Sequence, residues 1–343
     1  MELTNKNWAI PNRKNAQELI EKNVIELINS FAHLAEVCEY ESYNVESVFI
    51  KNIKGLSSDI SVLFFAHESL IKAIDNNDKA YCHQIFDTLF DFCINQRHYE
   101  KNSPLYTRFG KTYSIELEEM LQSIMQQDHY ETYQGKYNGR RSSIKTPSIS
   151  KTEHTSKVID LSLSNLKNVD ENHFDELSLL IKRIIIIESN GVNASSFLNM
   201  LGLFFLRYFE PSKEHWSRIL EHCVHESAHN LLYHIWYQEP VITDDNGTYY
   251  TPFRLDYRPL SGVYHAMFVL ARTIYAFDAL IQANLLKDKD IKSHYNEANN
   301  DTSFKEKFRQ TVQVIKQSGK LTSFGDRILN DCIELVENCK SSI

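Results

Sequence analysis

The sequence predicts a mainly helical protein with a small β-sheet, an α+β class with helical N- and C-terminal layers. Three observations favour this class. Apolar residues recur at helical spacing through most of the chain. Two short apolar runs, Ile184–Ile187 and Leu201–Leu206, are instead typical of strands. Directly after these runs, the segment Leu220–His229 carries the spacing H-E-x-x-H on a predicted helix.

The first 133 residues predict an N-terminal helical region. Apolar stripes at helical spacing, separated by polar and turn-forming residues, predict four helices in it. The predicted helices are Asn15–Val37, Ile60–Ile74, Ala80–Ile94 and Ile115–Met125.

Residues 134–157 break this pattern. They are rich in Ser, Gly, Thr, Lys and Arg, and Glu153 is their only acid. Such a composition predicts a basic flexible linker or a long surface loop. It serves as a solvated connector or, alternatively, as a basic contact for an acidic leader peptide. The remaining residues, 158–343, form the predicted metal-binding catalytic region.

Short strands and helices alternate in this second region. The alternating run Val158–Leu163 predicts a strand, and a short helix precedes the two apolar runs. The strands lead directly into the motif helix. This order is zincin-like, since an edge strand beside a metal helix can hold an extended peptide. The predicted helices are Phe174–Ile181, Ser212–Trp236, Gly262–Ala283, Thr302–Lys316 and Ser323–Asn338, with a loop over Gln238–Leu260.

Composition excludes several classes of protein. A net charge of −8 argues against a general nucleic-acid binder. No apolar run reaches the roughly 18 residues of a membrane span, and the N-terminus has no apolar signal region. The six cysteines include no C-x-x-C pair, which suits reduced thiols. We therefore expect a cytoplasmic protein that contacts neither membrane nor nucleic acid.

The motif predicts a metal site. Residues four apart on a helix lie about 40° from each other on one face, so His225 and His229 can bind one ion. Glu226 falls beside them, where a carboxylate acts as a base or orients a ligand. The alternative is a chance match.

Two histidines need a third ligand, and His265 is the best candidate. The chain has no glutamate between Glu239 and Glu297, which argues against a gluzincin. Position 235, where a metzincin has its third histidine, is Ile235. His265 stands near the start of the next predicted helix. The alternative is an ordinary buried histidine.

Three neutral imidazoles suit Zn(II) or Fe(II). Arg254, Arg258 and Arg272 surround the third histidine in sequence, and an arginine fork suits the distal carboxylate of a dicarboxylate cosubstrate. Alternatively, one of these arginines pairs with Asp256 or Asp278.

Several segments resemble the HExxH-type peptide β-hydroxylases that depend on 2-oxoglutarate and modify ribosomally made peptides. They are SNGVNASSFLNMLG, LEHCVHESAHNLL, TPFRLDYRPLSGVYHAMFVLAR and GKLTSFGDRIL. The resemblance covers roughly Ser189 to Leu329, and Leu220–Arg272 is its most specific part.

The resemblance implies that His225, His229 and His265 bind Fe(II), with Glu226 supporting them. Arg258 or Arg272 would hold 2-oxoglutarate, and O₂ would be the oxidant. The implied product is a precursor peptide hydroxylated at a β-carbon. Three histidines depart from the common ligand set of two histidines and one carboxylate.

Two other functions stay open at this point. One is a zinc metallopeptidase in which Glu226 activates a metal-bound water. The other is a metal-free binding protein, such as a peptide chaperone, in which the motif is accidental. The missing glutamate argues against the first, and the concentration of motifs in Leu220–Arg272 argues against the second.

Overall fold

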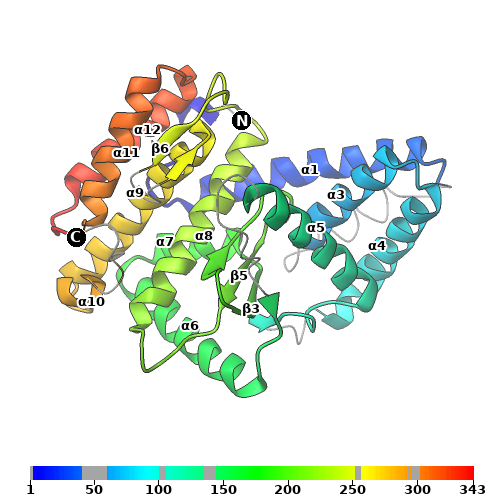
Figure 1. Cartoon of the computed structure of the whole chain (residues 1–343), viewed down its shortest axis with the longest axis horizontal. Coiled ribbons are helices and arrows are strands. Elements are labelled where there is room, and N and C mark those ends of the chain that lie inside the picture. Colours follow the sequence, from blue (N-terminus) through cyan, green and yellow to red (C-terminus); the bar gives the residue numbers. More distant parts are fainter. Residues whose placement is uncertain are drawn as a thin grey trace. The chain divides into compact units, whose positions relative to one another are not determined.

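The protein is mainly helical and carries a small mixed β-sheet, which confirms the predicted α+β class (Figure 1). The computed structural model describes residues 3–40, 60–99, 106–133, 144–251, 256–292, 294 and 302–343. Among these residues, no helix combines the length and the apolar character that a membrane crossing needs.

The chain divides into two compact units, each assembled from separate stretches of sequence. The sheet unit comprises Ile20–Thr152 and Ile181–Tyr208. The motif unit comprises Met1–Leu19, Glu153–Leu180 and Phe209–Ile343. The predicted division into consecutive regions, 1–133, 134–157 and 158–343, stays a prediction.

The sheet unit contains the four helices that the first third of the sequence predicts. Their apolar stripes are buried, as the helical spacing requires. Phe31 of the first helix packs edge-on against Phe86 of the third, with ring centroids 6.5 Å apart. The helices are α1 (Arg13–Val37, of which the part from Ile20 belongs to this unit), α3 (Ser61–Asp75), α4 (Lys79–Tyr99) and α5 (Ile115–Tyr133).

The sheet is built around two parallel strands, β3 (Arg183–Ser189) and β5 (Leu203–Arg207), which confirm both predicted apolar strands. Four consecutive isoleucines of β3, Ile184–Ile187, are fully buried, so both faces of this strand are covered. The strand order is β1-β3-β5-β4, and β2 pairs with β3. The outer strands are β1 (Tyr106–Arg108), β2 (Ile144–Lys145) and β4 (Ala194–Ser195).

One strand predicted near the middle of the chain is wrong. Val158–Leu163 is not a strand but part of helix α6 (Ile149–Val169). Its buried positions, Val158, Ile159, Ser162 and Leu163, recur every three to four residues, so they follow the helical period. The predicted linker is likewise helical from Ile149 on, while residues 134–143 lie outside the described part of the chain.

The described part of the motif unit is mainly helical and carries a hairpin. Phe174–Ile181 is confirmed as helical by α7 (Glu171–Leu180), and the hairpin β6–β7 lies in the predicted loop 238–260. The other elements are α8 (Trp216–Trp236), β6 (Tyr249–Thr251), β7 (Asp256–Arg258), α9 (Leu260–Gln282), α10 (Asp288–Lys292), α11 (Phe304–Ser318), α12 (Ser323–Asn338) and the short helix η1 (Leu3–Asn5).

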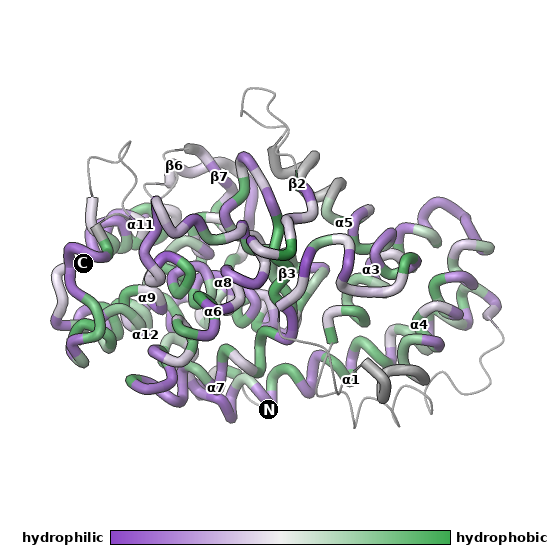
Figure 2. The backbone as a smooth tube through the Cα atoms, turned by 90° about the horizontal axis from the view of Figure 1, so that it is seen from below, coloured by the Kyte–Doolittle hydropathy of each residue, from purple (hydrophilic) through white to green (hydrophobic). Residues whose placement is uncertain are grey.

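Helix α9 is the centre of the motif unit. Every residue from Val263 to Ile274 is buried, and α9 packs against α8, α11 and α12 (Figure 2). A helix that is apolar on all sides belongs in a core. On α12, Gly325 allows a close approach, since a Cβ there would lie 1.9 Å from the carbonyl oxygen of Val241. The Oη of Tyr264 donates to the Gly325 carbonyl at 2.8 Å and so ties α9 to α12.

Among the described residues of this unit, two histidines away from the motif have no exposed surface. His173 of α7 and His234 of α8 are both inaccessible to solvent. Burial and the charge of Arg272 hold the pKa of His173 well below its usual range. Burial also lowers the pKa of His234 to about 3. Both rings are therefore neutral in the folded protein at neutral pH.

These histidines predict a loss of stability in mild acid. Below their unfolded pKa of about 6.5 they take up protons on unfolding but not in the folded state, so stability falls as the pH falls through that value. Each contributes a loss of up to about 2 kcal/mol at pH 5. Urea unfolding of His173→Phe between pH 5 and 8 is expected to show a correspondingly flatter pH dependence than the unsubstituted protein.

The matched control is His33→Gln, because the His33 side chain is 74% exposed. Its pH dependence is expected to match that of the unsubstituted protein. A His173→Phe variant that keeps the full acid sensitivity would contradict the assignment.

Candidate metal centre

Helix α8, which carries the motif, has one buried side and one more open side. Its apolar residues, among them Leu220, Val224 and Leu231, are buried against the rest of the unit. His225 and His229 are half-buried, and Glu226 is only 4% exposed. The helix begins at Trp216 with His215 as its N-cap, four residues after the predicted start at Ser212. The motif therefore stands within a continuous helix, as predicted.

The structure brings the three predicted histidines together. Nε2 of His229 lies 3.1 Å from Nε2 of His225, one turn earlier on α8. Nδ1 of His229 lies 2.7 Å from Nδ1 of His265, on α9. His265 is 7% exposed, and burial together with His229 holds its pKa well below the usual range. His265 is therefore neutral, which is the form that ligates a metal.

The donor chemistry fits a metal ion, but the ring orientations do not yet converge. His229 faces its two neighbours with different nitrogens, whereas an ion takes one nitrogen from each ring about 2.0–2.1 Å away. In the described ranges of the chain, no three His, Cys, Asp or Glu side chains surround a common point as ligands. A three-histidine site at this position requires one ring to turn.

Two aromatic residues of α8 flank the third histidine. The ring of Tyr233 lies nearly parallel to that of His229, at 19° and 5.9 Å between centroids. The same ring lies 4.8 Å from His265. Trp236 lies 4.4 Å from His265 at an interplanar angle of 72°. The wall of the candidate centre next to α8 is therefore apolar and aromatic.

The three predicted arginines have different surroundings. Arg254 lies outside the described residues. Arg258 is half-buried on β7, directly before the proline that precedes α9. A Cβ placed on Gly262 would lie 3.5 Å from the Cβ and 3.6 Å from the Cδ of Arg258. The stem of Arg258 thus follows the first turn of the helix that carries His265.

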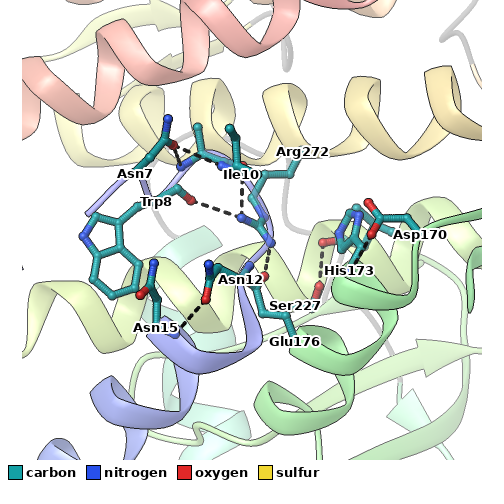
Figure 3. Close-up of polar contacts among 12 residues, drawn as sticks. Asn7, Trp8, Ile10, Asn12, Asn15, Asp170, His173, Glu176, Ser227 and Arg272 are labelled. Atoms are coloured by element: carbon teal, nitrogen blue, oxygen red, sulfur yellow. Dashed lines mark hydrogen bonds and ion pairs between the residues drawn. The ribbon is translucent and has the colours of Figure 1, made fainter. Parts of the chain in front are cut away.

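Arg272 is instead fully buried within the motif unit. Figure 3 shows its contacts with Trp8 and Glu176. Arg272 forms an ion pair with Glu176 of α7. It also donates to the backbone carbonyls of Trp8 and Ala9, at 3.1 and 3.2 Å. The second oxygen of Glu176 accepts from the backbone N–H of Asn12 at 2.6 Å. These contacts give Arg272 a structural role, which is to hold the N-terminal segment against α7 and α9.

A second polar cluster, which the sequence analysis missed, lies at the N-terminal end of α8. The Oγ of Ser217 lies 2.9 Å from Nε2 of His294, and Nδ1 of His294 lies 2.6 Å from Glu221. Arg218 donates to the same carboxylate at 2.7 Å. Burial alone would raise the pKa of Glu221, but Arg218 and His294 outweigh it and hold the pKa well below its usual range. The cluster fixes the start of the motif helix.

Only the contact between the two residues on α8 could have been predicted from the sequence. Arg218 and Glu221 stand three residues apart on one helix, a spacing typical of ion pairs. His294 comes from 77 residues further along the chain than Ser217, and no local pattern predicts that approach.

No protein-family model matches this chain, and no curated protein matches it. The resemblance to peptide β-hydroxylases therefore rests on the motifs quoted above.

The buried ion pair gives a prediction about stability. Arg272→Met leaves the Glu176 carboxylate buried without its cation, and such a loss typically costs about 3–5 kcal/mol. Arg13→Met is the matched control, because Arg13 pairs with Asp175 of the same helix α7 at 3.1 Å but is 57% exposed. The control is expected to cost at most about 1 kcal/mol in urea unfolding.

The same variant tests the cosubstrate role that the sequence also allows for Arg272. A stably folded Arg272→Met protein that had lost 2-oxoglutarate binding would assign Arg272 to the cosubstrate and contradict the structural role.

Proposed function

We propose that this chain is an Fe(II)- and 2-oxoglutarate-dependent dioxygenase that adds a β-hydroxyl group to a residue of a ribosomally synthesised precursor peptide. The observation that carries the proposal is the meeting of His225, His229 and His265 between α8 and α9. The H-E-x-x-H spacing alone supplies two of these side chains, and the packing of the two helices supplies the third.

The three histidines would hold Fe(II), and Glu226 would orient a ligand from its buried position beside them. Bound iron supplies the activation of O₂ that couples the conversion of 2-oxoglutarate to succinate and CO₂ with the conversion of a peptide C–H to C–OH. The protein's own task is to hold the iron, orient the cosubstrate and exclude water.

The cosubstrate has two carboxylates, and a cation is needed for the distal one. Arg272 is engaged by Glu176 and two carbonyls, so its contacts favour Arg258 for this role. Arg258 is only half-buried, and its stem lies one turn before His265. A guanidinium can bind a carboxylate with two parallel hydrogen bonds. We therefore assign the distal carboxylate to Arg258.

We place this reaction in the cytoplasm. Of the side chains that the structure describes, all six cysteines are free and buried, which suits a reducing compartment. Burial raises the pKa of Cys223, next to the motif, to about 12. Its side chain is fully buried, which suits a packing residue.

The most direct test is incubation of the protein with Fe(II), ascorbate, 2-oxoglutarate and a synthetic precursor peptide. The expected result is a peptide heavier by one oxygen atom, together with one succinate for each hydroxyl group. Peptide cleavage with Zn(II), independent of 2-oxoglutarate, would identify a metallopeptidase instead.

The ligand set predicts the effect of removing single histidines. His225→Ala, His229→Ala and His265→Ala are each expected to weaken Co(II) or Fe(II) binding more than about 100-fold, beyond the cost of changes outside the ligand shell. Titration calorimetry measures this, with His222→Ala as the control, since His222 lies on the same helix outside the motif. Undiminished metal affinity in His265→Ala would leave His265 as an ordinary buried histidine.

Glu226→Gln separates the two enzyme classes. A peptidase that loses its general base typically loses about 10²–10⁴ in rate. In the hydroxylase no side-chain base removes the hydrogen, and the amide partly replaces the orienting carboxylate. We expect a loss of about 10–100-fold in hydroxylation, with succinate still formed.

Because these two ranges meet, succinate and hydroxylated peptide are measured in the same reaction. Normal iron loading with no succinate would give Glu226 a direct chemical role and contradict the assignment.

A further inference from the structure

The face of α8 that carries the metal motif continues beyond it with aromatic side chains. Tyr233 and Trp236 follow His229 by four and seven residues, so His225, His229, Tyr233 and Trp236 share one face of the helix. Trp236 is the last residue of α8 and lies beside His265, the one candidate ligand that comes from another helix.

The indole N–H of Trp236 is buried and has no hydrogen-bond partner in the described part of the chain. The indole N–H can only donate a hydrogen bond, so its partner has to be an acceptor. Buried polar groups are nearly always paired, and one without a protein partner calls for a ligand or an ordered water. The N–H belongs to the Trp236 ring, whose centroid lies 4.4 Å from the centroid of the His265 ring.

The surroundings favour an anionic acceptor. The rings of Tyr233 and Trp236 beside His265 are uncharged, and Arg272, on the same helix as His265, is paired with Glu176. The aromatic wall thus has no charge of its own, and in such a place a hydrogen bond to a carboxylate is stronger than one to a neutral oxygen. Arg258 serves the distal carboxylate in the proposed function, which leaves the oxoacid end of the cosubstrate for the metal ion that the histidines would hold and for Trp236.

We propose that the Nε1–H of Trp236 donates a hydrogen bond to the oxoacid carboxylate of 2-oxoglutarate and so selects this class of cosubstrate. The inference rests on the proposed function, which it deepens by naming a residue that recognises the cosubstrate. No residue of the H-E-x-x-H motif has this role.

The test uses the full chain loaded with Zn(II), which holds the cosubstrate without turnover. The protein is labelled with ¹⁵N in its three tryptophans, Trp8, Trp216 and Trp236. Their indole signals are assigned with single Trp→Phe variants. On addition of 2-oxoglutarate, the Trp236 signal is expected to move to lower field. The Trp8 signal is expected to stay, since its Nε1 already donates to the carbonyl of Leu3 at 3.1 Å.

Trp236→Phe provides the second readout, because it keeps an aromatic ring beside His265 and removes the N–H. Calorimetry is expected to show 2-oxoglutarate binding about tenfold weaker, as for one lost hydrogen bond to a charged group, with Zn(II) affinity unchanged. Trp216→Phe is the matched control, because Trp216 lies at the other end of the same helix. It is expected to leave both affinities unchanged.

The outcomes separate this inference from the proposed function. If the unsubstituted protein binds neither Zn(II) nor 2-oxoglutarate, both are overturned. If it binds both ligands while the Trp236 signal stays in place and Trp236→Phe keeps its affinity, only the role of Trp236 is overturned. Loss of Zn(II) binding in Trp236→Phe would make the ring a structural support of His265 and would also overturn the inference.

Discussion

The burial of helix α9 is the constraint on which the motif unit depends. From Val263 to Ile274 no residue of this helix is exposed, so a polar side chain on it costs free energy unless it is paired inside the protein. Tyr264 donates a hydrogen bond to the carbonyl of Gly325, and the ring of His265 contacts that of His229. Arg272 pairs with Glu176 and donates to two carbonyls of the N-terminal segment. The candidate metal centre is thus one of several polar contacts that fix α9 among its neighbours.

Sequence reasoning works where the chemistry is local. The spacing of His225 and His229 alone places them one turn apart on a helix, and four consecutive isoleucines alone predict the buried strand β3. The same reasoning is ambiguous for Val158–Leu163, because a short alternating run fits both a strand and a half-buried helix. Burial on one side of α6 decides it, and that burial depends on packing which the sequence does not reveal.

Spacing in the sequence cannot decide whether Arg258 or Arg272 binds the cosubstrate. Arg272 follows His265 by two helical turns and shares its face, so the sequence alone makes it as good a cosubstrate anchor as Arg258. The structure separates the two through contacts that are distant in sequence, since Glu176 lies 96 residues before Arg272 and Trp8 lies 264 residues before it. Arg258 is instead half-buried, and its stem runs along the start of α9.

The two ring nitrogens of His229 determine whether the three histidines can bind one metal ion. One faces His225 and the other faces His265, so the three rings form a chain rather than a ring of donors around one point. Ligation by all three therefore competes with the contact between His229 and His265. The two aromatic rings of α8 lie within 5 Å of the His265 centroid and limit the directions in which that ring can turn. These two side chains thus limit which orientation of His265 is available to a metal ion.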